Sequence, residues 1–193
     1  MPIRGRLHFV ATAILGVLLG GCSLTSGLLP TQPPGTTQQL VIRSLERGLS
    51  GLYLHRFTGR GVKVDVFAQT GNETFVKEFV LSWLKAHGVR TVSKDPDLQL
   101  KVFATVLGTD RGETLVGLPS FQAPIVNVPF PEIALFKWVR HRGQTELQVF
   151  AFDGKTEEFV DRLPPGIGHA KSDDFTVLIF IGFSSSDLDM RMP

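Results

Sequence analysis

Three side chains near the C-terminus have types and a spacing that suit a divalent metal ion. His169, Asp173 and Asp174 lie within one short segment, and imidazole and carboxylate groups are common ligands of such ions. The alternative is a solvated loop ahead of the last strand, in which these side chains simply face water. The sequence favours this alternative, so we assign no metal and no cofactor.

Residues 166–171, Gly-Ile-Gly-His-Ala-Lys, combine two glycines with a lysine, the residue types of phosphate-binding loops. Their spacing fits neither phosphate-loop motif, and no strand leads through them into a helix. We therefore predict a turn here, with a ligand site as the alternative. The sequence also lacks the H-E-x-x-H, C-x-x-C and G-x-S-x-G patterns. The serines at 184–186 have no base nearby in the sequence, so we assign no catalytic residue.

Acidic side chains also occur within and just after predicted strands. Asp65 lies mid-strand, so its carboxylate should face solvent or pair with Lys63, Arg60 or Lys101. The functional alternative for Asp65 is an acid with a perturbed pKa. The aspartate and arginine at 110–111 follow another strand, and we expect them to form a local ion pair that shapes the next loop.

The only cysteine, Cys22, lies at the end of an apolar segment. A single cysteine excludes an intrachain disulfide and any cysteine-rich zinc or iron–sulfur site. Residues 19–22, Leu-Gly-Gly-Cys, resemble the bacterial lipobox. This resemblance implies cleavage before Cys22, a diacylglycerol on its sulfur and a fatty acid such as palmitate on the new amine. Ser23 follows the cysteine, which by the sorting rule of enteric lipoproteins implies the outer membrane.

The first residues are typical of a secretory signal peptide. Arg4 and Arg6 precede an apolar run at 7–19, which is shorter than the roughly 20 residues of a membrane-spanning helix. We therefore predict a signal peptide at 1–21, with a transmembrane anchor as the alternative. Residues 22–37, rich in Pro, Gly, Ser and Thr, are predicted to be the lipidated cysteine and a flexible tether.

The charge balance argues against nucleic-acid binding. The 193 residues include 20 Lys+Arg and 18 Asp+Glu. Without Arg4 and Arg6, the remaining 18 basic residues balance the 18 acidic ones. Binding to nucleic acid needs a basic cluster, and the sequence contains none, so we expect no such partner.

Two helices are predicted. The first is expected to begin at residue 36 or 37, where a threonine can cap it. Its apolar stripe comprises Val41, Leu45, Leu49 and Leu52. The second is expected between Asn72, which caps it, and Gly88, which ends it. Its buried face is predicted to comprise Phe75, Phe79, Val80 and Leu84.

Alternating or continuous apolar runs predict the strands. They cover residues 62–67, 89–92, 98–107, 133–139, 145–152, 157–163 and 175–183. The last run is almost wholly apolar and is predicted to be a central buried strand, and Asp153-Gly154 marks a hairpin turn. The expected fold is α+β: a mixed, largely antiparallel sheet of five to seven strands with two helices packed on one face. This single domain is predicted to span 38–189, with 190–193 as a tail.

Residues 108–131 are predicted to be irregular, because they contain glycines and four prolines. Their part at 112–131 is apolar, with Glu113 as its one charge. One interpretation is that these side chains fold back over the bare face of the sheet. The other is that several stay exposed and contact a partner. We assign the candidate contact to Leu118, Phe121, Ile125 and Val128.

The chain resembles a family of uncharacterised bacterial lipoproteins. The resemblance rests on GTTQQL at 35–40, GRGVKVD at 59–65, LGTDR at 107–111, PEIALFK at 131–137 and SSDL at 185–188. The family carries no assigned activity, so the resemblance implies localisation and a single domain and transfers no catalytic residue. The strand–helix–strand–strand part is more loosely similar to small modules of envelope-assembly and secretion lipoproteins.

Two classes of function remain open. The first, which the sequence favours, is a lipid-anchored, periplasm-facing lipoprotein that acts as a non-enzymatic binding or assembly module of the cell envelope. The alternative is a periplasmic hydrolase-type enzyme with a site built from loops, and carriage of a lipid or small molecule is a lesser option. The expected partners are the membrane, through the lipid on Cys22, and an envelope protein.

Overall fold

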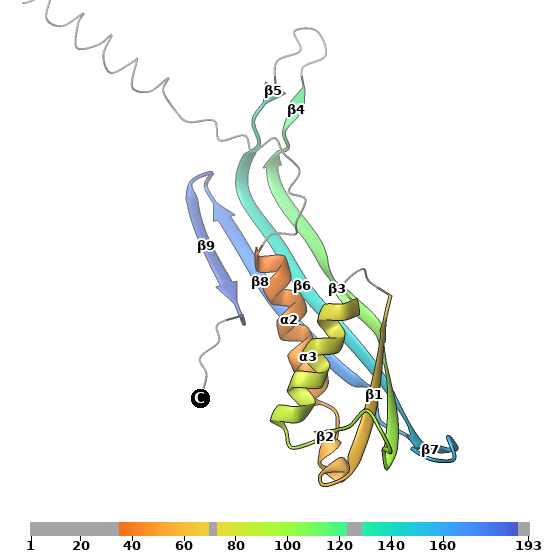
Figure 1. Ribbon diagram of the computed structural model, residues 1–193. Coiled ribbons are helices and arrows are strands. Elements are labelled where there is room, and N and C mark those ends of the chain that lie inside the picture. The colour runs from red at the N-terminus through yellow and green to blue at the C-terminus, as the bar shows by residue number, and fades with distance from the viewer. Residues whose placement is uncertain (1–34, 70–72, 123–128, 189–193) are drawn as a thin grey trace, which may run out of the picture. The chain divides into compact units, whose positions relative to one another are not determined.

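Residues 35–69, 73–122 and 129–188 are described by a computed structural model (Figure 1). The helices are α2 (Gly35–Ser50), the short 3-10 helix η1 (Leu54–Phe57) and α3 (Glu73–Ala86). The strands are β1 (Gly61–Ala68), β2 (Arg90–Thr91), β3 (Leu98–Leu118), β4 (Phe121–Gln122), β5 (Pro129–Phe130), β6 (Ile133–Asp153), β7 (Phe159–Arg162), β8 (Gly166–Val177) and β9 (Ile181–Ser186). In the described residues, no helix is both long and apolar enough to cross a membrane.

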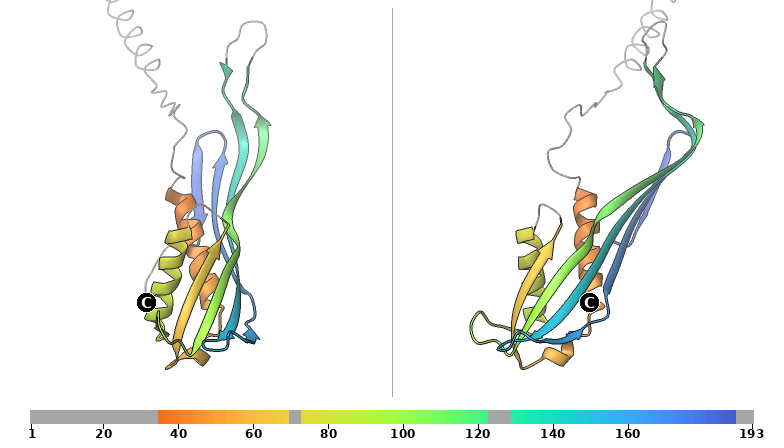
Figure 2. Two further views of the ribbon diagram at one scale, coloured as in Figure 1. Left: turned by 45° about the vertical axis from the view of Figure 1, so that its right-hand side comes forward. Right: turned by 90° about the vertical axis from the view of Figure 1, so that its right-hand side faces the viewer.

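Seven strands form one mixed sheet, in the order β2-β1-β3-β6-β8-β9, with β7 paired to β6. β1 is parallel to both of its neighbours, and every other pairing in this sheet is antiparallel. Both α-helices lie on one face of the sheet (Figure 2), so the predicted α+β class is confirmed. The opposite face carries no helix of the described chain.

The core lies between the sheet and the two helices. Its largest fully buried side chains come from α2, α3 and the three central strands: Leu45, Leu49, Leu84, Leu100 and Leu147 are examples. Gly88 ends the turn after α3 with a positive φ of 80°, as predicted. The predicted buried face of α3 is wrong at Phe75, which is 49% exposed, because the buried stripe of the helix runs through Val76, Val80 and Leu84 and leaves Phe75 beside it.

α2 approaches the sheet closely because glycines line its path. A Cβ atom on Gly168 would lie 1.8 Å from the Ser44 carbonyl oxygen, and one on Gly143 would lie 2.4 Å from that of Leu40. Residues 166–171 are therefore part of strand β8, and our prediction of a turn is wrong. The two glycines make room for a helix. α2 also begins at Gly35, so its first turn includes residues assigned to the tether.

β3 and β6 are each 21 residues long and pair over their whole length. The prediction of irregular structure from residue 108 is therefore wrong as far as Leu118, because pairing with β6 keeps Gly108 and Gly112 in the ladder. The predicted strands at 133–139 and 145–152 are one strand. The predicted hairpin turn after Asp153 is confirmed by the pairing of β6 with β7.

The apolar run at 175–183 is two strands and not one buried strand. β8 ends at Val177, the chain reverses, and β9 begins at Ile181 as the edge of the sheet. All six residues of β9 are exposed. The prediction failed because Leu178 and Ile179, with φ of 50° and 74°, form the turn without the glycine or asparagine that normally marks one.

Candidate functional site

The outer edge of β1 is largely unpaired within the described residues. β2 covers only its start, where Gly61 and Val62 pair with Arg90 and Thr91. The Val62 carbonyl accepts a hydrogen bond of 2.9 Å from the Val92 amide on this side. Backbone groups alternate in direction along a strand, so the N–H and C=O groups of Val64 and Val66 point to the same, open side.

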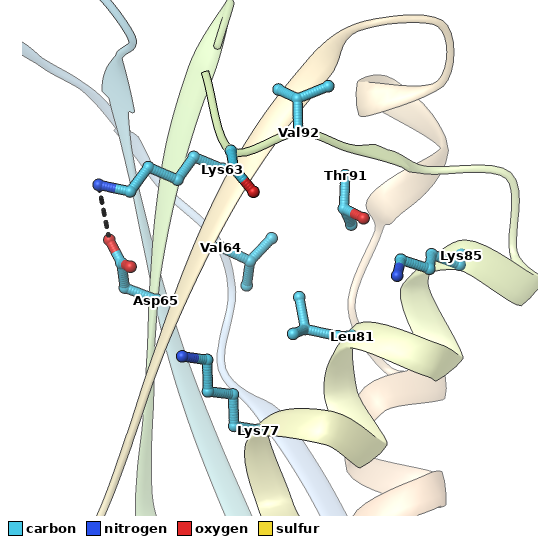
Figure 3. A pocket seen from close by; sticks show the side chains of 9 residues that line it. Lys63, Val64, Asp65, Lys77, Leu81, Lys85, Thr91 and Val92 are labelled. Atoms are coloured by element: carbon cyan, nitrogen blue, oxygen red, sulfur yellow. Dashed lines mark ion pairs between the residues drawn. The ribbon is translucent and has the colours of Figure 1, made fainter. Parts of the chain in front are cut away.

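α3 forms a wall beside this edge and creates a groove (Figure 3). One hollow of about 450 Å³ lies at the β2 end and is lined by Val64, Lys77 and Leu81, among others. A second of about 370 Å³ continues it toward Phe67. Asp65 and Lys77 line both. We call this continuous channel between β1 and α3 the edge groove.

The two ends of the edge groove differ in charge. Lys63, Lys77 and Lys85 line the hollow nearest β2. Glu73 and Glu78 line the other end. In Figure 3, Lys77 extends from α3 toward β1, whereas the Asp65 carboxylate points toward Lys63. A ligand lying along β1 would therefore meet positive charge at one end and negative charge at the other.

Asp65 lies between these two ends, and it pairs with Lys63, as one of the predicted alternatives proposed. Its carboxylate is 3.7 Å from the Lys63 ammonium and accepts a 2.6 Å hydrogen bond from the Gln99 side chain.

The predicted ion pair between Asp110 and Arg111 is wrong. Neighbouring residues of a strand point to opposite faces, so Asp110 instead accepts a hydrogen bond from Gln144, and Arg111 pairs with Glu113.

The three candidate metal ligands do not converge. All lie in β8 and not in a solvated loop, so Asp173 and Asp174 point to opposite faces of the sheet. Asp173 accepts hydrogen bonds from Arg142 at 2.8 Å and from the Trp138 indole at 3.1 Å. Burial works to raise the pKa of this carboxyl, but the bonds from Arg142 and Trp138 outweigh it, so the pKa is lowered. Asp174 lies near His141.

The predicted contact residues that can be placed are exposed. Leu118 and Phe121 are 57% and 51% exposed, and the Phe121 ring stacks on Phe130 with centroids 4.9 Å apart. These side chains therefore do not fold back over the sheet. Ile125 and Val128 lie outside the described residues, as do Cys22 and the other residues of the signal, tether and tail before 35 and after 188.

A second apolar hairpin lies beside them. The amides of Leu178 and Ile179 donate hydrogen bonds of 2.9 Å to the carbonyls of Leu135 and Ala134, which holds the β8–β9 turn against the end of β6. Left-handed backbone conformations at residues such as Leu178 and Ile179 cost about 1–3 kcal/mol each. Burial of the next side chain does not offset this cost, because Phe180 in the turn is 80% exposed. We call segments 118–122, 129–135 and 178–183 the apolar end.

The sequence alone did not reveal the edge groove. The one feature of the sequence that could have indicated this groove is the short apolar run at 89–92, which cannot cover the whole of β1. That inference also requires knowing that this run pairs with β1, and the sequence does not give the order of the strands. No protein-family model and no curated protein matches the chain.

Proposed function

We propose that this protein is a lipid-anchored, periplasm-facing cell-envelope lipoprotein and acts as a non-enzymatic binding module. The observation that carries the proposal is the open edge of β1 inside the edge groove. An unpaired edge with a wall beside it suits an extended segment of another protein, which adds to the sheet as a further strand. The resemblance of the sequence to uncharacterised bacterial lipoproteins supports the proposed lipid anchor.

The backbone of β1 supplies the hydrogen bonds. The N–H and C=O groups of Val64 and Val66 face the groove, while both side chains are buried in the core. A partner strand would bond to these groups without displacing any side chain from the core. In the described part of the chain, β9 is also an edge strand, but, unlike β1, it has no α-helix aligned with it to form the wall of a groove (Figure 1).

The side chains that line the groove supply the selection. Lys77 and Lys85 project from α3 beside the open edge, and Lys63 lies on β1. We therefore expect the bound segment to carry acidic residues at the β2 end. Glu73 and Glu78 favour a basic residue at the other end.

The anchor determines where the groove is presented. A diacylglycerol on Cys22 and a fatty acid on its amine would hold the chain on the membrane, and Ser23 favours the periplasmic face of the outer membrane in a Gram-negative cell. The partners are then the membrane, through the lipid, and an envelope protein. No nucleic acid or cofactor enters the proposal.

Photo-cross-linking in cells, followed by peptide binding, tests the groove. A benzophenone amino acid is placed at Lys77, and a control probe at Lys155, which is exposed in the β6–β7 turn. We expect the first probe, and not the second, to label one segment of an envelope protein. A synthetic peptide of that segment should bind the purified full-length chain, and its binding should be lost when the peptide amides that face β1 are N-methylated.

Charge variants supply the matched control. Lys85→Glu should weaken binding of the acidic end of that peptide, whereas Lys155→Glu, with the same charge change, should not. The proposal fails if the N-methylated peptide binds as well as the unmodified one, or if the label maps to a folded surface and not to an extended segment.

A further inference from the structure

The apolar end gathers exposed side chains from two hairpins. Leu118 and Phe121 come from the β3–β6 hairpin, and Leu178, Ile179 and Phe180 come from the β8–β9 turn. The hydrogen bonds from this turn to β6 hold the two hairpins side by side, as both Figure 1 and Figure 2 show. Exposed apolar side chains of two neighbouring hairpins therefore lie at the same end of the sheet.

This surface is nearly free of charge. Glu132 is the one charged residue in segments 118–122, 129–135 and 178–183, and its carboxylate lies 2.8 Å from the Lys137 ammonium. The hydrogen bond from Lys137 to Glu132, together with that to Glu113, raises the pKa of the lysine, so the pair stays ionised and mutually neutralised. A surface of this chemistry suits hydrocarbon better than it suits water.

α2 begins toward the same end of the sheet. Leu40 of α2 lies against Gly143 of β6, and Gly48 lies against Gly166, which pairs with Leu147 of β6. The start of α2 at Gly35 is therefore the end of the helix that is nearer to the apolar end. Gly35 follows Cys22 by 13 positions, and a chain of that length reaches at most about 45 Å. From Gly143 to Phe130, which pairs with Phe121, the chain advances by at most about 43 Å. A lipid on Cys22 can therefore enter the plane that the apolar end would touch.

We infer that the apolar end docks on the lipid bilayer that receives the anchor, with Phe121 and the Leu178–Phe180 turn in its interfacial layer. This inference rests on the lipid anchor of the proposed function. Docking would give the left-handed apolar turn an apolar environment. It would also fix the direction in which the sheet leaves the membrane, and hence where the edge groove is presented.

Fluorescence quenching in vesicles tests the inference. If Cys22 is lipidated, the mature chain has no free thiol, so Phe180→Cys introduces the only site for a thiol-reactive NBD dye. The labelled full-length lipoprotein is reconstituted in vesicles of phosphatidylethanolamine and phosphatidylglycerol that contain a doxyl-labelled lipid. Lys155→Cys, at the opposite end of β6, is the matched control. Leu118→Cys is a second variant at the apolar end, should Phe180→Cys fail to fold.

We expect the dye at position 180 to shift to the blue and to lose most of its fluorescence to the doxyl lipid, while the dye at 155 does neither. Equal behaviour at the two positions would overturn the inference. A blue-shifted dye at 180 that doxyl lipid does not quench would also overturn it, in favour of contact with a second copy of the chain. If the unmutated protein itself takes up dye at Cys22, the anchor of the proposed function fails, and this result is distinguishable from both others.

Discussion

Gly168 is the position at which the addition of one methyl group should damage the fold most clearly. In Gly168→Ala, the new Cβ would lie 1.8 Å from the Ser44 carbonyl oxygen and 2.5 Å from the Gly48 nitrogen. Both are backbone atoms of α2, so no side chain can rotate away. The whole helix must retreat from β8, or the strand must bend.

The expected loss of stability has two sources. Overpacking of this kind costs about 1–3 kcal/mol. Retreat of α2 also stretches the buried hydrogen bond between the Ser44 and Thr145 hydroxyls, now 2.8 Å long, and leaving such groups unsatisfied costs about 1–3 kcal/mol. We therefore expect the free energy of unfolding to fall by about 4 kcal/mol, and the Tm to fall by roughly 8–16 °C.

Urea denaturation followed by circular dichroism measures the change. Gly108→Ala in β3 is the matched control, since a Cβ there would meet no atom within 4 Å, and its stability should change little. Equal stability of the two variants would refute the close approach of α2 to β8, and with it the explanation given for the glycines at 166–171.

Three further predictions concern other parts of the chain. Asp173→Asn should lose about 1.5–3 kcal/mol at pH 7, since the three hydrogen bonds that the carboxylate accepts from Arg142 and Trp138 lose their charged acceptor. Because the pKa of Asp173 is lowered in the folded state, its stabilisation is present above the ordinary value of about 3.9 and is lost as the pH falls; denaturation below pH 4 should show the two proteins converging. Phe79→Ala should cost about 2 kcal/mol, because the ring is only partly buried against the core, and Phe75→Ala should cost less in the same urea assay. Cys22→Ser should abolish labelling by radioactive fatty acid and release the chain from carbonate-washed membranes, and a variant that still pellets would contradict the anchor.

Local patterns in the sequence were sufficient for the elements whose two faces differ. The alternation of Val62, Val64 and Val66 with polar residues marked β1, and the apolar face ended by Gly88 marked α3. The class of fold followed from the order of such elements. These predictions were correct because the spacing of apolar residues within a short segment is enough to indicate which face is buried.

Tertiary contacts explain the errors. The glycines in 166–171 led us to predict a turn, but they allow the backbone of α2 to approach β8. The local sequence of β8 gives no sign of that distant helix. The turn at Leu178 and Ile179 contains no glycine, asparagine or proline, so we predicted one buried strand where the structure has a hairpin. The edge groove depends on which strand neighbours β1, and this pairing joins segments about 30 residues apart.

Amide hydrogen exchange of the free full-length chain tests the open edge of β1 most directly. Lys63 and Asp65 direct their amides toward β3, with which β1 pairs along its length, whereas Val64 and Val66 direct theirs into the edge groove. We predict alternating protection along β1, with slow exchange at Lys63 and Asp65 and fast exchange at Val64 and Val66. Equally slow exchange at all four amides would show that the edge is already covered, and would contradict the proposed binding of an extended partner segment.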